Sequence, residues 1–284
     1  MAEDKLQLQR FELKYLINEG TARAIQDFVR AYLEIDEFGE SMPGFSYPVH
    51  SLYLDSDDLK LYQSTINGTK NRFKLRLRYY DEGPESPVFF EVKRRMNNCI
   101  LKQRGGVRRE AVPWLLAGHL PEPGNMISDG AAKLVALQRF SALMSEMHAT
   151  PKVHIAYERE AWISRSDNSV RVTMDRSVRC EPECGPRLST RLGDPIAVFG
   201  VGVVLELKFT NNFPNWFREL TRAFNLVQTG ASKYVDGIWL MGEYRLKNPL
   251  ARFEWLDAAH PINGQQRRVI PSENMISFME REER

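Results

Sequence analysis

Polar and apolar residues alternate one by one along several stretches of this chain. In NRFKLRLRYYD (71–81), the apolar residues Phe73, Leu75 and Leu77 separate the cations Arg72, Lys74, Arg76 and Arg78. Successive side chains of a β-strand point to opposite faces, so a strand here places four cations on one face and apolar side chains on the other. Because like charges in such a row repel each other, the pattern predicts that something anionic lies against the cationic face.

The same alternation predicts seven further strands, and helical spacing predicts the segments between them. The expected strands are 8–17, 49–56, 71–80, 87–95, 99–110, 151–163, 169–179 and 201–210. Helices are expected after Asn18, which is suited to cap a helix, and over 57–67, 128–148, 212–227 and 232–246. About eight antiparallel strands with a few helices predict an α+β fold whose sheet closes into a barrel wide enough to hold a ligand.

The chain shows no internal repeat and no obvious interdomain linker. We therefore expect one domain over residues 1–246, with residues 247–284 as a peripheral arm of the same domain. The aromatic residues expected to pack in the core beside the barrel are Trp216, Phe217, Phe224 and Trp239.

The polar faces of the other expected strands also carry charges. These faces hold Arg10, Glu12 and Lys14; Glu91, Lys93 and Arg95; Lys102 and Arg104; Tyr157 and Arg159; Arg171, Thr173 and Asp175; and Glu206 and Lys208. An antiparallel sheet often has one solvated polar face. Here, however, residues 72–78 carry only cations on that face, and Glu206 and Lys208 lie in the apolar run IAVFGVGVVLELKF. We therefore expect the charged faces to turn inward around a common tunnel.

A cation-lined interior favours a phosphate-bearing polyanion. Arginine forms bidentate hydrogen bonds to phosphate oxygens, and lysine supplies a point charge. Carboxylates among the cations offset part of their repulsion and, with phosphate oxygens, are typical ligands of Mg²⁺ or Mn²⁺. An RNA-binding sheet would instead interleave aromatic side chains with the cations, whereas Phe73 falls on the apolar face. No nucleic-acid partner is therefore expected.

Composition restricts the picture further. The net charge is only +2 over 284 residues, so the positive charge must be local. No apolar run is long enough to span a bilayer, and the start MAEDKLQLQRF lacks the apolar segment of a signal peptide, so we expect a cytoplasmic protein. Three cysteines predict free thiols rather than a disulfide framework or a zinc site. The five histidines are scattered, and each is expected to be structural.

Over residues 8–245 the sequence resembles the triphosphate tunnel metalloenzymes (the CYTH-like superfamily), and within them the vacuolar transporter chaperone, or polyphosphate polymerase, domain. The motifs that carry the resemblance are RFELKYLI, SLYLDSDD, KLRLRYY, FFEVKRR, YERE, VRVTMD, LELKF and SKYVDG, in this order. The resemblance implies an antiparallel barrel that forms a tunnel around a triphosphate or polyphosphate. It also implies ATP as the phosphate donor and a divalent metal, Mn²⁺ or Mg²⁺, as the cofactor.

The resemblance also implies the residues of the site. The residues implied to bind phosphates, and to act in catalysis through their charges, are Lys14, Arg76, Arg78, Lys93, Arg159, Arg171 and Lys233. Further substrate contacts are expected from Lys102 at a tunnel mouth and from Tyr157, Lys208 and Ser232. Glu206 is implied to bind the metal, with Glu12 and Glu91 as helpers.

Two positions depart from the pattern of these families. Hydrolytic members of the superfamily begin with Glu-x-Glu-x-Lys, whereas this chain has Arg10 at the first position, before Glu12 and Lys14. The loss of that carboxylate favours a polymerase over a hydrolase. In the family's polymerase a second lysine lies three residues before the lysine matched by Lys233, and this chain has Gly230 there.

The resemblance therefore predicts a metal-dependent polyphosphate polymerase, which transfers the γ-phosphate of ATP to a growing polyphosphate chain. Two alternatives use the same binding residues. One is an inorganic triphosphatase or tripolyphosphatase, in which water attacks in place of the phosphate chain. The other is a non-catalytic module that binds polyphosphate or another polyanion.

Overall fold

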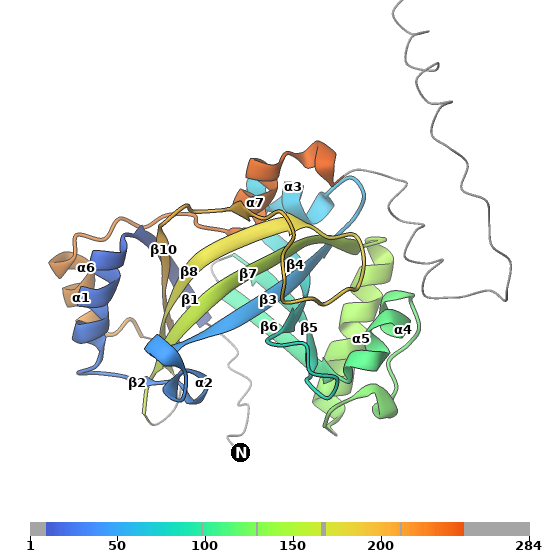
Figure 1. The fold of residues 1–284 in the computed structure, drawn as a ribbon, viewed down its shortest axis with the longest axis horizontal. Coiled ribbons are helices and arrows are strands. Elements are labelled where there is room, and N and C mark those ends of the chain that lie inside the picture. The colour runs from blue at the N-terminus through green and yellow to red at the C-terminus, as the bar shows by residue number, and fades with distance from the viewer. Residues whose placement is uncertain (1–9, 98, 129, 166–168, 211, 247–284) are drawn as a thin grey trace, which may run out of the picture.

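The fold is built on one ten-stranded antiparallel sheet (Figure 1). The computed structural model describes residues 10–97, 99–128, 130–165, 169–210 and 212–246. The strands are β1 (Arg10–Ile17), β2 (Glu34–Ile35), β3 (Ser46–Asp55), β4 (Asn71–Tyr79), β5 (Val88–Met96), β6 (Cys99–Val107), β7 (Thr150–Ile163), β8 (Val170–Pro182), β9 (Ile196–Ala197) and β10 (Val203–Thr210). The helices are α1 (Glu19–Val29), α2 (Glu37–Glu40), α3 (Lys60–Ile66), α4 (Val112–Leu116), α5 (Ala131–Glu146), α6 (Asn215–Ala223) and α7 (Lys233–Met241). Short 3₁₀ turns span Pro43–Phe45, Arg109–Ala111, Pro123–Asn125 and Glu243–Arg245.

The sheet curls so that strands from its two ends meet. Its strand order is β2-β7-β3-β4-β5-β6-β1-β10-β8-β9, and β8 also pairs with β7. The eight long strands therefore follow one another in a ring, but a single residue pair, Arg10 with Ile100, joins β1 to β6. The sheet is thus not closed by a continuous ladder of hydrogen bonds at this seam. The antiparallel sheet with peripheral helices predicted from the sequence is confirmed. It has ten strands rather than about eight, because β2 and β9 add two residues each.

Residues 228–231 lie along the edge of β1 at this seam. Tyr15 forms an isolated antiparallel bridge with Gln228, and the Thr229 amide donates to the Lys14 carbonyl at 2.8 Å. The Lys14 ammonium also donates to the Ala231 carbonyl at 3.1 Å. Because the other edge of β1 is fully paired with β10, this segment pairs with backbone groups that β6 leaves free. The segment then leads directly into α7.

Helices cover the outer face of the sheet in three groups (Figure 1). Helix α5 packs on β5 and β6, where the Phe90 and Phe140 ring centroids lie 4.9 Å apart. Helices α3 and α7 cover a second apolar cluster, and α1 and α6 a third that includes Leu205 and Phe217. Each fully buried leucine or phenylalanine side chain in these clusters stabilises the fold by about 1.5–3 kcal/mol. The helices bury the apolar face of the strands, and the charged face points to the inside of the curled sheet.

Asp55, at the end of β3, fixes the position of α3 and α7. Its buried carboxylate accepts hydrogen bonds from the backbone amides of Leu61 and Tyr62, each at 2.9 Å. It also accepts one from the Tyr234 hydroxyl at 2.6 Å. Tyr234 stacks on Tyr53 with ring centroids 4.7 Å apart. Since Tyr234 follows Lys233, these contacts hold the start of α7 where Lys233 reaches the interior.

Several expectations about the helical layer need correction. Trp239 is not in the core, since 73% of its surface is exposed. Helix α7 instead buries Tyr234, Ile238 and Met241, which share one helical face and leave Trp239 on another. Phe217 is buried as expected, and Trp216 and Phe224 are partly buried. The short helices α2 and α4 were not predicted. The arm expected at residues 247–284 lies outside the described residues.

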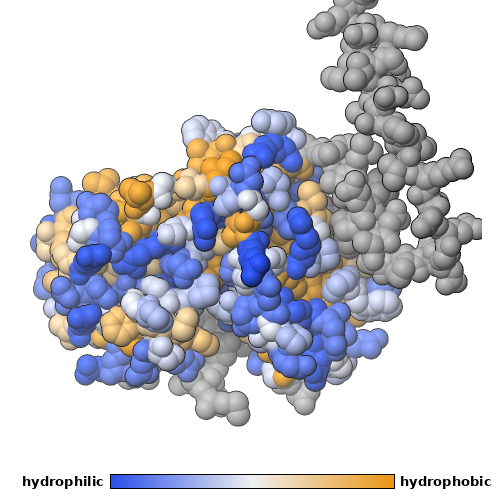
Figure 2. All heavy atoms as spheres, viewed as in Figure 1, coloured by the Kyte–Doolittle hydropathy of each residue, from blue (hydrophilic) through white to orange (hydrophobic). Residues whose placement is uncertain are grey.

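The outer surface is polar with small apolar areas. Figure 2 shows hydrophilic side chains over most of the face in view, with hydrophobic ones between them. None of the helices that the structure describes combines the length and apolar character needed to cross a bilayer.

Candidate functional site

The register of the strands brings the predicted charged residues onto one inner face. On β4, β5 and β6, Arg76 lies opposite Glu91, which lies opposite Arg104. One step along, Lys74, Lys93 and Lys102 face each other in the same way. On β1, β10 and β8, Lys14 lies opposite Glu206 and Glu206 opposite Thr173. Alternation along each strand thus assembles a charged interior.

Glu91 is the centre of one ion cluster in this interior. Its side chain is fully buried and lies 2.6 Å from Arg76 Nη2, 2.8 Å from Lys102 Nζ and 3.4 Å from Arg104 Nε. Burial alone would raise the pKa of Glu91, but Lys102 and Arg76 outweigh it and hold this pKa well below its ordinary value. Glu91 therefore stays ionised and offsets part of the charge of three cations.

Glu206 is the centre of a second cluster, and four cations surround it. Its oxygens lie 2.5 Å from Lys208 Nζ, 3.2 Å from Lys14 Nζ, 3.3 Å from Lys233 Nζ and 3.8 Å from Arg159 Nη2. Burial opposes ionisation of this carboxyl, but the four cations, Lys208 first, lower its pKa well below the ordinary value. One carboxylate among four cations leaves a local excess of positive charge.

Asp175 completes this cluster, although no role was expected for it from the sequence. Its two oxygens accept hydrogen bonds from Arg159 Nε and Nη2, both at 2.7 Å, and Lys233 Nζ lies 2.6 Å away. The alternation in VRVTMD, which places Asp175 on the face of Arg171 and Thr173, was the available signal. The bidentate contact fixes the plane of the Arg159 guanidinium.

Glu12 links the two sides of the seam between β1 and β6. Its carboxylate lies 2.9 Å from Lys93 Nζ on β5 and 3.2 Å from Lys14 Nζ. The Lys14 ammonium therefore bridges Glu12 and Glu206, each at 3.2 Å. Glu12 and Glu206 share this neighbourhood, whereas Glu91 belongs to a separate cluster.

Arg171 and Ser232 have partners that the sequence did not reveal. Arg171 Nη2 donates to Asp36 at 2.6 Å, and Asp36 also accepts from the Gly39 amide in α2. Arg171 is thus tied to a loop rather than to the central carboxylates. The Ser232 hydroxyl accepts a hydrogen bond from Lys74 Nζ at 2.8 Å, at the start of α7.

Lys74 and Arg78 are the cations that lack a carboxylate partner within the described part of the interior. Arg78 is buried, and its Nη2 donates to the Tyr157 hydroxyl at 2.9 Å, while its Nε has no hydrogen-bond partner there. Lys74 Nζ donates to the Ser232 hydroxyl and lies 5.6 Å from the centroid of the Tyr234 ring, and the nearby Asp236 carboxylate is too far away to form an ion pair with it. Burial and the neighbouring cations, Lys14 first, lower the pKa of Lys74 well below its ordinary value. A phosphate anion beside these two groups would supply the missing partner.

Cations outnumber carboxylates in the charged interior. The cations are Lys14, Lys74, Arg76, Arg78, Lys93, Lys102, Arg104, Arg159, Arg171, Lys208 and Lys233. The carboxylates that contact them are Glu12, Asp36, Glu91, Asp175 and Glu206. Such an excess in a poorly solvated space is costly unless an anion or water offsets it. The arrangement is therefore chemically suited to hold an extended polyanion.

A divalent metal fits the donor set near Lys14. No group of three histidine, cysteine, aspartate or glutamate side chains suited to a metal occurs among the described residues. Mg²⁺ and Mn²⁺ are nevertheless commonly held by one or two carboxylates together with phosphate oxygens. Glu12 and Glu206 already share one cationic group, the Lys14 ammonium. Glu206 and Asp175 share Lys233 in the same way, so the geometry offers Glu206 with either Glu12 or Asp175, without Glu91.

The histidines His50 and His154 lie away from this interior. His50 Nδ1 lies 3.1 Å from His154 Nε2, which in turn lies 3.1 Å from the Tyr79 hydroxyl. Both rings are buried, and burial lowers the pKa of His50 to about 4 and that of His154 to about 3. They therefore stay neutral at physiological pH and act as packing groups.

Lys208 is expected to make anion binding depend on pH. Burial lowers the pKa of Lys208 to about 7, although the charge of Glu206 acts in the opposite direction. Below this pH the side chain is cationic, and above it the side chain is neutral. The affinity for tripolyphosphate should therefore fall as the pH rises through 7, by about tenfold for one contact with a charged group. Titrations of the wild type and of Lys208→Met between pH 6 and 8.5 would check this. Burial also lowers the pKa of Lys102 to about 7, so the variant keeps part of the slope, and a wild-type slope no steeper than that of the variant would contradict the expectation.

The structure thus defines an antiparallel sheet protein with a cation-rich interior. The family model of the VTC domain matches residues 9–241, so the chain belongs to the VTC domain family. This confirms the family expected from the motifs.

The known proteins similar to the chain include a fungal protein and a bacterial protein of known structure. The vacuolar transporter chaperone complex subunit 4 of Schizosaccharomyces pombe (strain 972 / ATCC 24843) is 22% identical, over 79% of this chain and 36% of that protein. The chain thus spans about a third of that relative's length. The crystal structure of a candidate adenylate cyclase from Bacillus halodurans matches with a TM-score of 0.46 and 16% identity, over 79% of this chain and 94% of that one. A likeness at that level adds no argument about fold or activity.

Proposed function

We propose that the protein is a metal-dependent polyphosphate polymerase, which moves the γ-phosphate of ATP onto a growing polyphosphate chain. The observation that carries the proposal is the pair Lys74 and Arg78, two inward cations without a carboxylate partner in the described interior. They lie among further cations in excess over carboxylates, in a chain of the VTC domain family. A polyphosphate carries charge at regular intervals and suits such a row better than a single compact anion.

We further propose that the curled sheet encloses a tunnel for this chain. The seam between β1 and β6 has one residue pair, but two kinds of contact span it. The ion pair between Lys93 and Glu12 crosses it at 2.9 Å, and residues 228–231 lie along the β1 edge. The hydrogen bond from Lys74 to Ser232, the residue that follows this segment, connects it to β4. Side chains and this segment would thus close the wall that the hydrogen-bond ladder leaves incomplete.

The proposed reaction is an in-line phosphoryl transfer. A terminal oxygen of the polyphosphate chain forms a bond to the γ-phosphorus, the bond from that phosphorus to the β–γ bridging oxygen breaks, and ADP leaves. Arg78 and Lys74 would hold the phosphates, while Arg159 and Lys233 would stabilise the charge on the transferred group. Lys14 would orient the chain beside Glu206. A divalent cation held by Glu12 and Glu206 would neutralise phosphate oxygens when it is bound.

Hydrolysis is disfavoured by the state of the carboxylates. Glu12, Glu91, Asp175 and Glu206 each contact at least two cations in the charged interior. A carboxylate held in this way is a poor base, because its cations lower its proton affinity. These four carboxylates are therefore poorly suited to take a proton from an attacking water molecule.

An incubation with ATP and Mn²⁺ would test the proposed activity. The products should be resolved on a gel that separates polyphosphate lengths, with free phosphate assayed in parallel. We expect chains that lengthen with time. Free phosphate without chains would indicate the hydrolase. Binding of tripolyphosphate without either product would indicate the non-catalytic module.

Replacing Gly230 by lysine should strengthen anion binding. Gly230 is exposed, and a Cβ atom added there meets nothing within 4 Å, so the site has room for a side chain. The residue lies in the segment 228–231, two positions before Ser232. We expect Gly230→Lys to lower the Kd for tripolyphosphate about three- to tenfold, as one added charge contact would. Gly230→Met serves as the uncharged control, and equal affinities of the two variants would contradict the expectation.

A further inference from the structure

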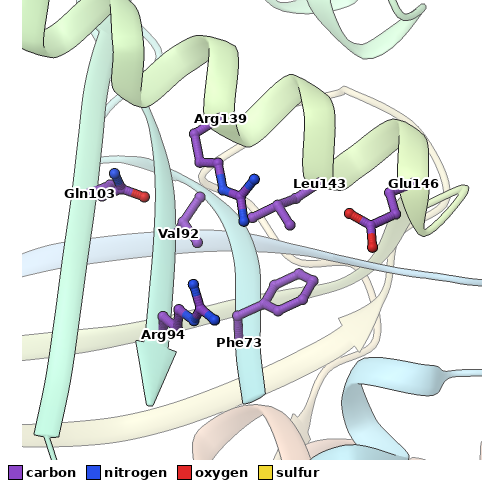
Figure 3. Close-up of a pocket in the computed structure, with 7 residues that line it drawn as sticks. All are labelled: Phe73, Val92, Arg94, Gln103, Arg139, Leu143 and Glu146. Carbon is purple, nitrogen blue, oxygen red and sulfur yellow. The ribbon is translucent and has the colours of Figure 1, made fainter. Parts of the chain in front are cut away.

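A cavity lies on the outer face of the sheet, away from the charged interior. It is formed between α5 and the strands β4, β5 and β6, and its volume is about 190 Å³ (Figure 3). Its lining residues are Phe73, Val92, Arg94, Gln103, Arg139, Leu143 and Glu146.

Packing at the two ends of α5 explains why the cavity forms. Near the start of α5, Gly105 lets the helix approach β6 so closely that an added Cβ would lie 2.4 Å from Leu137 Cγ. Further along the helix, the facing strand positions carry longer side chains, since Arg94 lies opposite Phe73 and Val92 opposite Gln103. These side chains hold the later turns of α5 away from the sheet, and space remains between them.

The polar groups of the cavity are not paired with each other. Figure 3 shows Arg139 extending from α5 and Arg94 rising from β5, with Val92 between them and Glu146 beyond Leu143. Among the described residues, Arg94, Arg139 and Glu146 form no side-chain hydrogen bond or ion pair. Both guanidinium groups are exposed, so solvent screens their mutual repulsion, and both keep their hydrogen-bond donors available to an anion in the cavity. Phe73, Val92 and Leu143 line the same cavity with apolar surface.

We propose that this cavity binds a small organic carboxylate that carries one apolar group. A carboxylate is the planar anion that arginine binds in bidentate geometry, so Arg94 and Arg139 would hold it from two sides. The apolar group would lie against Phe73 and Leu143. A volume of about 190 Å³ is a little larger than the apolar cavity of about 150 Å³ that accepts benzene. The ligand is therefore limited to about one ring or one branched aliphatic group.

Glu146 gives this site a different charge from that of the charged interior. With Glu146 beside two arginines the lining carries a single net positive charge, which one carboxylate neutralises, so tripolyphosphate and ATP should bind the far more cationic interior instead. The inner and outer faces share strands, since Phe73 precedes Lys74 and Arg94 follows Lys93. The site is nevertheless defined by its own residues, and the proposal does not depend on the activity proposed above.

Saturation-transfer NMR with phenylacetate and 4-methylvalerate as probes would test the proposal on the full chain. Either probe should receive saturation from the wild type at about 10 mM, the weak end expected for a ligand of this size. The double variant Arg94→Gln/Arg139→Gln should raise the Kd at least tenfold. Arg218→Gln, which removes an exposed arginine from α6, is the matched control and should bind like the wild type.

The outcomes separate the proposal from its rivals. Saturation of neither probe by the wild type would overturn it, as would unchanged binding in the double variant. Displacement of a bound probe by tripolyphosphate would place the ligand in the charged interior and would also overturn it. Glu146→Gln gives a further check, because the variant should keep phenylacetate binding and gain competition by tripolyphosphate. The result stands whether or not the protein makes polyphosphate, since no activity is measured.

Discussion

Replacing Lys74 and Arg78 together by methionine is expected to weaken tripolyphosphate binding more than 100-fold without destabilising the fold. Each side chain would lose a hydrogen bond to a charged group, worth about 1.5–3 kcal/mol, so the Kd should rise more than 100-fold. Neither cation forms an ion pair with a carboxylate in the described interior, so the substitutions leave no buried carboxylate without its ion pair. They also relieve repulsion from Arg76 and Lys93. The free energy of unfolding should therefore stay the same or rise.

Isothermal titration and urea denaturation would measure the two effects. The control variant is Arg218→Met/Arg222→Met, which removes two cations from the exposed face of α6 and should leave binding unchanged. A contrasting variant is Arg76→Met, which strands the fully buried Glu91 and should lower stability. Wild-type affinity in the Lys74→Met/Arg78→Met variant would show that the inward cations do not hold the anion.

Glu206→Gln is expected to reduce the stability of the free protein strongly. This buried carboxylate is surrounded by four cations: Lys14, Arg159, Lys208 and Lys233. Without its negative charge, the repulsion among these cations is no longer offset. Breaking a buried cluster of this kind typically costs about 3–5 kcal/mol of unfolding free energy. The pKa of Glu206 lies well below its ordinary value, so this contribution is present near neutral pH and is lost as the pH falls through the lowered pKa.

Tripolyphosphate should restore much of the stability that Glu206→Gln loses. An anion that binds the folded state raises its stability with concentration, and four cations remain to bind it. The variant should still bind tripolyphosphate but should lose metal-dependent turnover, since Glu206 is a proposed metal ligand. Thermal unfolding with and without tripolyphosphate would measure this, with Glu219→Gln on the exposed face of α6 as the control. An unfolding free energy equal to that of the wild type would show that Glu206 does not hold the cluster together.

The alternation of residue types predicted the strands and their inner faces well. The cations of 72–78 fall on one face of β4, as the period of two requires, and Leu75 and Leu77 are buried on the other. Glu206 in its apolar run was correctly placed on an inward-facing central strand. Such patterns are local, because each side chain's direction follows from its own strand.

Pairings between distant segments could not be predicted from the sequence. The partner of Arg171 is Asp36, which lies in the loop before α2. Asp175 on β8 binds Arg159 on β7 and Lys233 at the start of α7. The segment 228–231 lies against β1, more than two hundred residues earlier. These contacts depend on how the sheet curls, which no short stretch of sequence encodes. Trp239 was misplaced because an aromatic residue in a helix does not reveal which face is covered.

The most direct test of the account is a crystal structure of the protein with tripolyphosphate bound. We expect the anion inside the curled sheet, with phosphate oxygens within hydrogen-bond distance of Lys74 Nζ and of the Arg78 guanidinium. Tripolyphosphate bound only on the outer surface, with the inner cations still in contact with the carboxylates alone, would contradict the account.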